Sequence, residues 1–72
     1  MEKNLTVEQL RKKYPMESLE GHFEKIEKEG YQVSPCEYQC TIWKGTKLII
    51  DADEYDDFHS NAASAIHCFY ID

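Results

Sequence analysis

The stretch from Tyr38 to Ala52 constrains the fold more than any other part of this 72-residue chain. On both sides of Gly45, apolar side chains recur at every second position, which is typical of half-buried strands. A glycine between two such runs indicates a tight turn. The stretch therefore predicts a β-hairpin, and the remaining elements must pack around it.

The position of the turn decides which face of the hairpin is apolar. A two-residue loop at positions 44 and 45 would place apolar and charged side chains on the same face. A three-residue loop at 43–45, with Gly45 in the left-handed region, makes one face continuously apolar. We therefore predict the three-residue loop, which gives the pairs Ile42–Thr46, Cys40–Leu48 and Tyr38–Ile50. Trp43 and Ile49 then lie together on the opposite face.

Two helices are predicted before the hairpin. Residues 6–9, Thr-Val-Glu-Gln, have the pattern of a capping box, and Pro15 ends the first helix. The second helix is indicated by apolar residues at spacings of three and four, namely Met16, Leu19, Phe23 and Ile26. Gly30 is the residue expected just after its end. Gly21, in the middle of this helix, indicates close packing against another element.

The remaining segments predict a short strand and a last helix. The strand is expected at 31–33, and Pro35 either confines it to a sheet edge or ends it. From Tyr55 to Phe69 apolar residues recur at helical spacing, and the acids of 53–57 would crowd the first helical turn. Residues 67–71 fit both a helix and a final strand, and the continuing helical spacing favours a helix.

These elements predict an α+β fold in the order α-α-β-β-β-α. Two N-terminal helices and a C-terminal helix pack on a small antiparallel β-sheet built on the hairpin. The chain has 72 residues, so we expect a single domain over residues 1–72.

The net charge of −6 is unevenly distributed. Residues 36–72 carry seven acids and two bases, and five of those acids lie within 51–57. Such a surface repels nucleic-acid phosphates and anionic membranes, and it attracts a basic partner. No apolar run approaches the roughly 20 residues that span a bilayer, and no signal-peptide pattern occurs. We therefore expect a cytoplasmic protein.

The acidic run at 51–57 is the strongest candidate site, and it has two interpretations. Its acids can form the solvated start of the last helix, where the helix dipole stabilises them. They can instead bind an Arg- and Lys-rich protein surface by imitating phosphates. A calcium loop is disfavoured, because Tyr55, Asp56 and Ala62 stand where an EF-hand needs an oxygen ligand, Gly and Glu.

Metal and catalytic sites are not indicated by the cysteines and histidines. Three cysteines, an odd number, argue against a disulfide scaffold. In a straight strand Cys36 and Cys40 would lie about 13 Å apart, too far to share a zinc ion. Cys40 and Cys68 are expected as small buried apolar residues. No nucleophile motif or glycine-rich phosphate loop occurs, so we expect no enzyme and no cofactor.

Trp43 also has two interpretations. Its face of the sheet can be covered by Tyr14 or by the N-terminal helix. If that face is exposed, a tryptophan beside acidic residues is typical of an interface anchor.

The element order α-β-β-β-α and the alanine-rich segment 61–65 resemble the double-stranded-RNA-binding domain over residues 16–70. That family carries lysines at the start of its last helix, where they bind phosphates. The corresponding positions here are acidic, namely Asp53, Glu54, Asp56 and Asp57, and this departure removes the RNA-binding function.

In size, charge and element order the chain is also similar to small acidic phage proteins, including anti-CRISPR and DNA-mimic inhibitors. This resemblance implies an inhibitor that occupies the basic nucleic-acid-binding surface of a host enzyme, such as a CRISPR effector, in the host cytosol.

The sequence as a whole predicts a non-enzymatic acidic protein-binding module. The predicted contact residues are Asp51, Asp53, Glu54, Asp56 and Asp57, with Tyr55 packing between them and Trp43 as an anchor. The alternative is a homodimeric structural or regulatory protein, joined through the Trp43/Ile49 face or through an open sheet edge.

Overall fold

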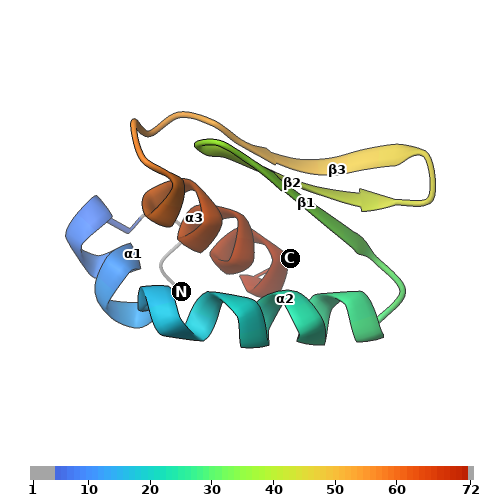
Figure 1. Cartoon of the computed structure of the whole chain (residues 1–72), viewed down its shortest axis with the longest axis horizontal. Helices are drawn as coiled ribbons and strands as arrows, with labels where there is room; N and C mark the ends of the chain where they lie inside the picture. Colours follow the sequence, from blue (N-terminus) through green and yellow to red (C-terminus); the bar gives the residue numbers. More distant parts are fainter. Residues whose placement is uncertain (1–4, 72) are drawn as a thin grey trace.

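The computed structural model describes residues 5–71. Its elements are α1 (Val7–Lys13), a short 3₁₀ turn η1 (Met16–Ser18), α2 (Leu19–Lys28), β1 (Gln32–Cys36), β2 (Gln39–Lys44), β3 (Lys47–Ala52) and α3 (Phe58–Ile71). The strands form one antiparallel sheet in the order β1-β2-β3, and the helices lie on one side of it (Figure 1). This is the predicted α+β fold. No helix within residues 5–71 is long and apolar enough to cross a membrane.

The boundaries of α1 are set by local chemistry, as predicted. The Thr6 hydroxyl accepts a hydrogen bond from the Gln9 amide at 3.1 Å, and the Gln9 side chain accepts one from the Thr6 amide at 2.9 Å. These two bonds form the complete capping box. At the other end Tyr14 leaves the helical region, because Pro15 follows it.

The apolar stripe of the second helix faces the core, but its first residue does not. Leu19 and Ile26 are buried, whereas Met16 lies in the 3₁₀ turn and is exposed. Gly30 has a φ of +99°, in agreement with its predicted place after the helix end. The prediction for Gly21 is wrong, because a Cβ added there would meet no atom within 4 Å. This glycine lies on the exposed side of α2 and packs against nothing.

The predicted register of the hairpin is wrong. The loop consists of Gly45 and Thr46, so Lys44 pairs with Lys47. Gly45 does adopt the left-handed region, with a φ of +64°. None of the three predicted cross-strand pairs forms, and the observed pairs are Cys40–Ala52, Thr41–Asp51, Ile42–Ile50 and Trp43–Leu48.

A β-bulge explains why the even loop still produces an apolar face. Trp43 pairs with Leu48 and Ile42 pairs with Ile50, so Ile49 is one extra residue on β3. The extra residue reverses the alternation of the strand and brings Ile50 onto the same face as buried Ile42. Leu48, rather than Ile49, therefore lies opposite Trp43.

β1 is longer than predicted and contains Pro35. It is an edge strand, which agrees with the first of the two alternatives for this proline. Val33 is its buried residue and pairs with Ile42 of the central strand.

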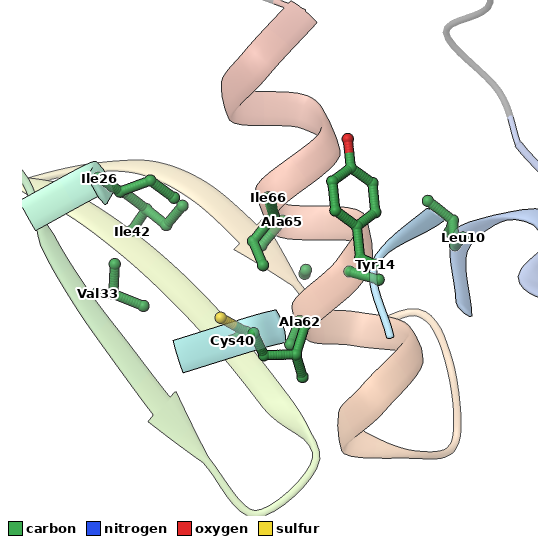
Figure 2. Packing of buried hydrophobic residues seen from close by; sticks show 12 residues of the cluster. Leu10, Tyr14, Ile26, Val33, Cys40, Ile42, Ala62, Ala65 and Ile66 are labelled. Carbon is green, nitrogen blue, oxygen red and sulfur yellow. The ribbon is translucent and has the colours of Figure 1, made fainter. Parts of the chain in front are cut away.

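The core lies between α3 and the sheet (Figure 2). α1 packs against α3, and α2 packs against both β1 and α3. α3 continues through residues 67–71, in agreement with the favoured alternative. Its buried face carries Ala62, Ala63, Ala65 and Ile66, all fully inaccessible to solvent. Small alanine side chains allow the helix backbone to approach the strands closely. The largest fully buried apolar side chains are Ile26, Ile42 and Ile66.

We expect Ile66→Ala to destabilise the protein by about 3 kcal/mol, because it leaves a cavity in a fully buried site. Alanine has the higher helix propensity, so the loss would come from packing alone. Ile49→Ala is the matched control, since Ile49 is 38% exposed and should lose under about 1 kcal/mol. Urea unfolding of both variants measures the difference, and equal losses would contradict the described core.

Candidate functional site

The acidic run 51–57 is divided among three structural environments. Asp51 belongs to β3, and α3 begins only at Phe58. The prediction that the acids of 53–57 lie in the first helical turn is therefore wrong. Asp53, Glu54 and Asp56 lie instead on an exposed loop between β3 and α3.

Asp57 explains why the helix starts late. The Ser60 amide donates a hydrogen bond to its Oδ2 at 2.9 Å, and the Ser60 hydroxyl donates to its Oδ1 at 2.9 Å. The Asp57 carbonyl also accepts the amide of Asn61. Asp57 is thus the N-cap, a position with non-helical backbone. The hydrogen bond from the Ser60 amide is the main reason that the pKa of Asp57 lies below its ordinary value, and Arg11 lowers it further.

Asn61 holds the loop in place from the first turn of α3. Its side chain is fully buried. Its Oδ1 accepts the Tyr55 amide at 3.0 Å, and its Nδ2 donates to the Tyr55 carbonyl at 3.0 Å and to the Tyr38 carbonyl. One amide side chain therefore joins α3, the acidic loop and the turn between β1 and β2.

A group of acidic residues gathers around this contact, at one end of the molecule. We define the acidic end as Glu37, Asp51, Asp53, Glu54 and Asp56, all of which are exposed. Figure 1 shows the β1–β2 turn and the β3–α3 loop side by side above the start of α3, and the bonds of Asn61 confirm this.

Sequence reasoning missed Glu37 and Asn61. Glu37 is distant from the acidic run in the sequence. The sequence signal that could have identified Asn61 is its amide side chain within an apolar helical stripe. A buried amide needs hydrogen-bond partners, so such a residue indicates a contact with other polar groups.

Tyr55 is half-buried and turns toward the protein. It packs against the hydrophobic core and borders a small hollow together with Leu10 and Cys68. Burial is the main cause that raises the pKa of its hydroxyl, and the charge of Glu54 raises it further. The Tyr55 side chain therefore contributes to the core and is only partly accessible to solvent.

Trp43 lies on the face of the sheet that the helices leave open, which we call the outer face. Its indole nitrogen donates to the Thr41 hydroxyl at 3.1 Å, and Thr41 pairs with Asp51 on β3. The expectation that Tyr14 or α1 covers Trp43 is wrong. Tyr14 is buried on the other side of the sheet, with its hydroxyl 3.1 Å from Nδ1 of His67 on α3.

Asp51 and Trp43 share the outer face. Asp51 pairs with Thr41 across the two strands, and Trp43 follows Thr41 by two residues on β2, so all three side chains lie on the same face. The Asp51 carboxylate is oriented by Gln39, whose amide nitrogen donates to it at 2.7 Å. The structure thus places one of the predicted acidic residues, Asp51, on the same face as Trp43, whereas Asp53, Glu54 and Asp56 lie on the loop after β3.

The histidines and buried cysteine take part in packing. His59 donates from Nε2 to the Tyr14 carbonyl at 2.7 Å, and Nδ1 of His22 lies 2.7 Å from the Tyr70 hydroxyl. Burial, followed by the charge of Lys25, lowers the pKa of His22. Burial raises the pKa of the Cys40 thiol to about 11, which leaves it protonated and inert at neutral pH. Within residues 5–71 no group of three potential ligands could hold a metal ion.

Asp57→Ala should destabilise the protein by about 1 kcal/mol, whereas Asp57→Asn, which keeps a capping side chain, should lose less. Because the folded pKa of Asp57 is lowered, its ionised form stabilises the fold above the unfolded pKa near 3.8. That stabilisation is lost as the pH falls through the folded pKa. Urea unfolding between neutral pH and pH 3 should show a smaller acid-dependent loss in both variants than in the wild type. An unchanged pH dependence would contradict the cap.

Asn61→Ala should destabilise the protein by about 2 kcal/mol, because it removes a fully buried side chain that bonds the partly buried backbone groups of Tyr55 and Tyr38. The Tyr55 amide should also exchange its hydrogen faster. Ser64→Ala on the same helix is the control and should leave that amide protected. Hydrogen exchange followed by NMR measures the Tyr55 amide in both variants. Unchanged protection of that amide in Asn61→Ala would show that Asn61 does not hold the loop.

A scan against protein-family models found no match, and searches of curated proteins and of solved structures found no significant match to this chain.

Proposed function

We propose that this protein is a non-enzymatic binding module whose acidic end and outer face bind a basic protein. The most specific form of the proposal is an inhibitor that occupies the nucleic-acid-binding surface of a host enzyme, such as a CRISPR effector, in the host cytosol. One observation supports it most directly. The exposed carboxylates of the acidic end belong to a loop and a turn whose backbone is held by hydrogen bonds from the buried side chain of Asn61.

The fixed backbone matters because ordering a loop opposes binding. A mobile loop loses conformational freedom when a partner immobilises it, and this loss subtracts from the affinity. Here Asn61 bonds both backbone groups of Tyr55, in the middle of the loop, and also the neighbouring turn at Tyr38. The carboxylates are therefore presented at defined positions before any partner arrives.

The charge distribution favours a basic partner. Residues 48–58 contain five acids and no lysine, arginine or histidine. Lys44 and Lys47 lie at the hairpin tip, and Lys47 is about 13 Å along the strand from Asp51. One end of the molecule therefore carries a concentrated negative field, which accelerates encounter with a positive surface and is weakened by salt.

Trp43 supplies an apolar anchor next to this charge. Tryptophan is among the residues that contribute most to binding energy at protein interfaces. It lies on the outer face, two residues along β2 from Thr41, which pairs with Asp51. A partner surface that carries arginine side chains would contact the carboxylates and also stack on the indole.

A charge-neutral variant of the acidic end tests the proposal. We would replace four acids by their amides, using Asp51→Asn, Asp53→Asn, Glu54→Gln and Asp56→Asn, and leave the Asp57 cap intact. The control carries the same change in net charge on exposed positions of α2 and its C-cap, using Glu20→Gln, Glu24→Gln, Glu27→Gln and Glu29→Gln. Each protein is immobilised, exposed to nuclease-treated host lysate, and its bound proteins are identified by mass spectrometry.

We expect the wild type and the α2 control to retain the same basic nucleic-acid-binding protein, and the acidic-end variant to lose it. Added DNA or RNA and added salt should both release it from the wild type. Retention by the acidic-end variant, or equal loss in both variants, would reject the acidic end as the binding site. Retention that competing nucleic acid does not affect would reject the inhibitor form alone.

A further inference from the structure

The last turn of α3, residues 68–71, has the weakest local support in this helix. The apolar spacing favours a helix there, but residues 67–71 also fit a strand, and the turn contains no basic residue that would interact with the helix dipole. Residues 60–67 are buried apart from Ser64, whereas none of residues 68–71 is buried. Contacts with other elements therefore decide how firmly this turn is held.

Aromatic contacts attach this turn to the rest of the protein. The Phe69 ring meets Tyr31 edge to face, with centroids 5.0 Å apart. The Tyr70 hydroxyl lies 2.7 Å from Nδ1 of His22 on α2, and these two rings meet edge to face with centroids 5.5 Å apart. The end of α3 thus lies beside α2 (Figure 1). The contact between Tyr70 and His22 includes a hydrogen bond to a group that titrates near physiological pH.

This hydrogen bond depends on a neutral imidazole. Burial, followed by the charge of Glu29, raises the pKa of the Tyr70 hydroxyl, so this group keeps its proton at neutral pH and can donate it to Nδ1 of His22. In a protonated imidazole both ring nitrogens carry hydrogen, and neither accepts a hydrogen bond. Protonation of His22 therefore removes the acceptor of the Tyr70 hydroxyl.

The surroundings of His22 favour its neutral form. Burial, followed by the charge of Lys25 on the same helix, lowers the pKa of His22. From the corner between α1 and α2, the Tyr14 ring meets the imidazole edge to face with centroids 5.3 Å apart, and Nζ of Lys13 lies 6.0 Å from the Tyr14 centroid. Glu17 borders the same shallow hollow as His22 and Lys25. The net effect of these groups is to disfavour the protonated imidazole.

We propose that the contact between His22 and Tyr70 is a pH-sensitive lock, which holds the last turn of α3 in the helix at neutral pH and releases it when His22 is protonated. Because the folded pKa of His22 is lowered, the stabilisation is present in full above the ordinary histidine pKa of 6.5. It is lost as the pH falls through the folded pKa. The rest of α3 keeps its buried face and stays helical.

His59 provides the matched control, because protonation does not remove its hydrogen bond. Its Nε2 donates to the Tyr14 carbonyl at 2.7 Å, and a protonated imidazole still carries that hydrogen. His59→Gln keeps an amide donor and removes the titration. His22→Asn keeps an oxygen acceptor for the Tyr70 hydroxyl and also removes the titration. Tyr70→Phe keeps the ring and removes the hydroxyl.

NMR spectroscopy of the full chain tests the lock. The histidine ring signals and the Cα chemical shifts of residues 60–71 are followed from about pH 8 to about pH 5, a range that contains the ordinary histidine pKa and lies above those of carboxylates. In the wild type and in His59→Gln, we expect the shifts of residues 68–71 to move toward coil values with the midpoint of the His22 titration, which lies below 6.5. The shifts of residues 60–66 should stay helical.

In His22→Asn the shifts of residues 68–71 should stay helical over the whole range. In Tyr70→Phe they should no longer follow the titration of His22, and this variant changes only an exposed side chain. A last turn that stays helical in the wild type while His22 titrates would overturn the proposal. So would a His22 that titrates at or above 6.5, or a response in Tyr70→Phe equal to that of the wild type.

Discussion

The structure depends on the close approach of α3 to the sheet. Three alanines of this helix are fully buried, and their small side chains let the helix backbone lie near β2 and β3. Isoleucines from α2, β2 and α3 are the largest fully buried apolar side chains of the core. A domain of this size has a small core, so one well-packed helix supplies much of its buried apolar surface.

The same helix positions the candidate site. Asn61 immediately precedes the first of the buried alanines and extends the buried face with an amide. Because that amide is inaccessible to water, its hydrogen bonds to Tyr38 and Tyr55 must be satisfied within the protein. The packing that stabilises the fold therefore also fixes the backbone of the acidic loop, because Asn61 belongs to the buried face of α3 and bonds that backbone.

The small size of the chain also explains its open surfaces. All the helices lie on one side of the sheet, so the outer face and the β3 edge remain accessible (Figure 1). A chain of 72 residues buries a smaller fraction of its surface than a larger domain, and the described helices of this chain cover one face of the sheet. The accessible surfaces carry the features on which the proposed function rests, namely Trp43 and the acidic end.

Local chemistry in the sequence determined the order and type of the elements. The Thr6 capping box, the end of α1 before Pro15, the left-handed Gly30 and the continuous helix to Ile71 are decided by residues within a few positions of each other. The tertiary structure decided the hairpin register, because the extra residue at Ile49 brings Ile50 onto the same face as Ile42 and the alternation within the strand gives no local signal of it. It likewise decided the start of α3 and the assembly of the acidic end, because Asn61 bonds to backbone up to 23 positions away. Hydrogen bonds between distant segments depend on how the segments pack, and periodicity within one segment does not contain that information.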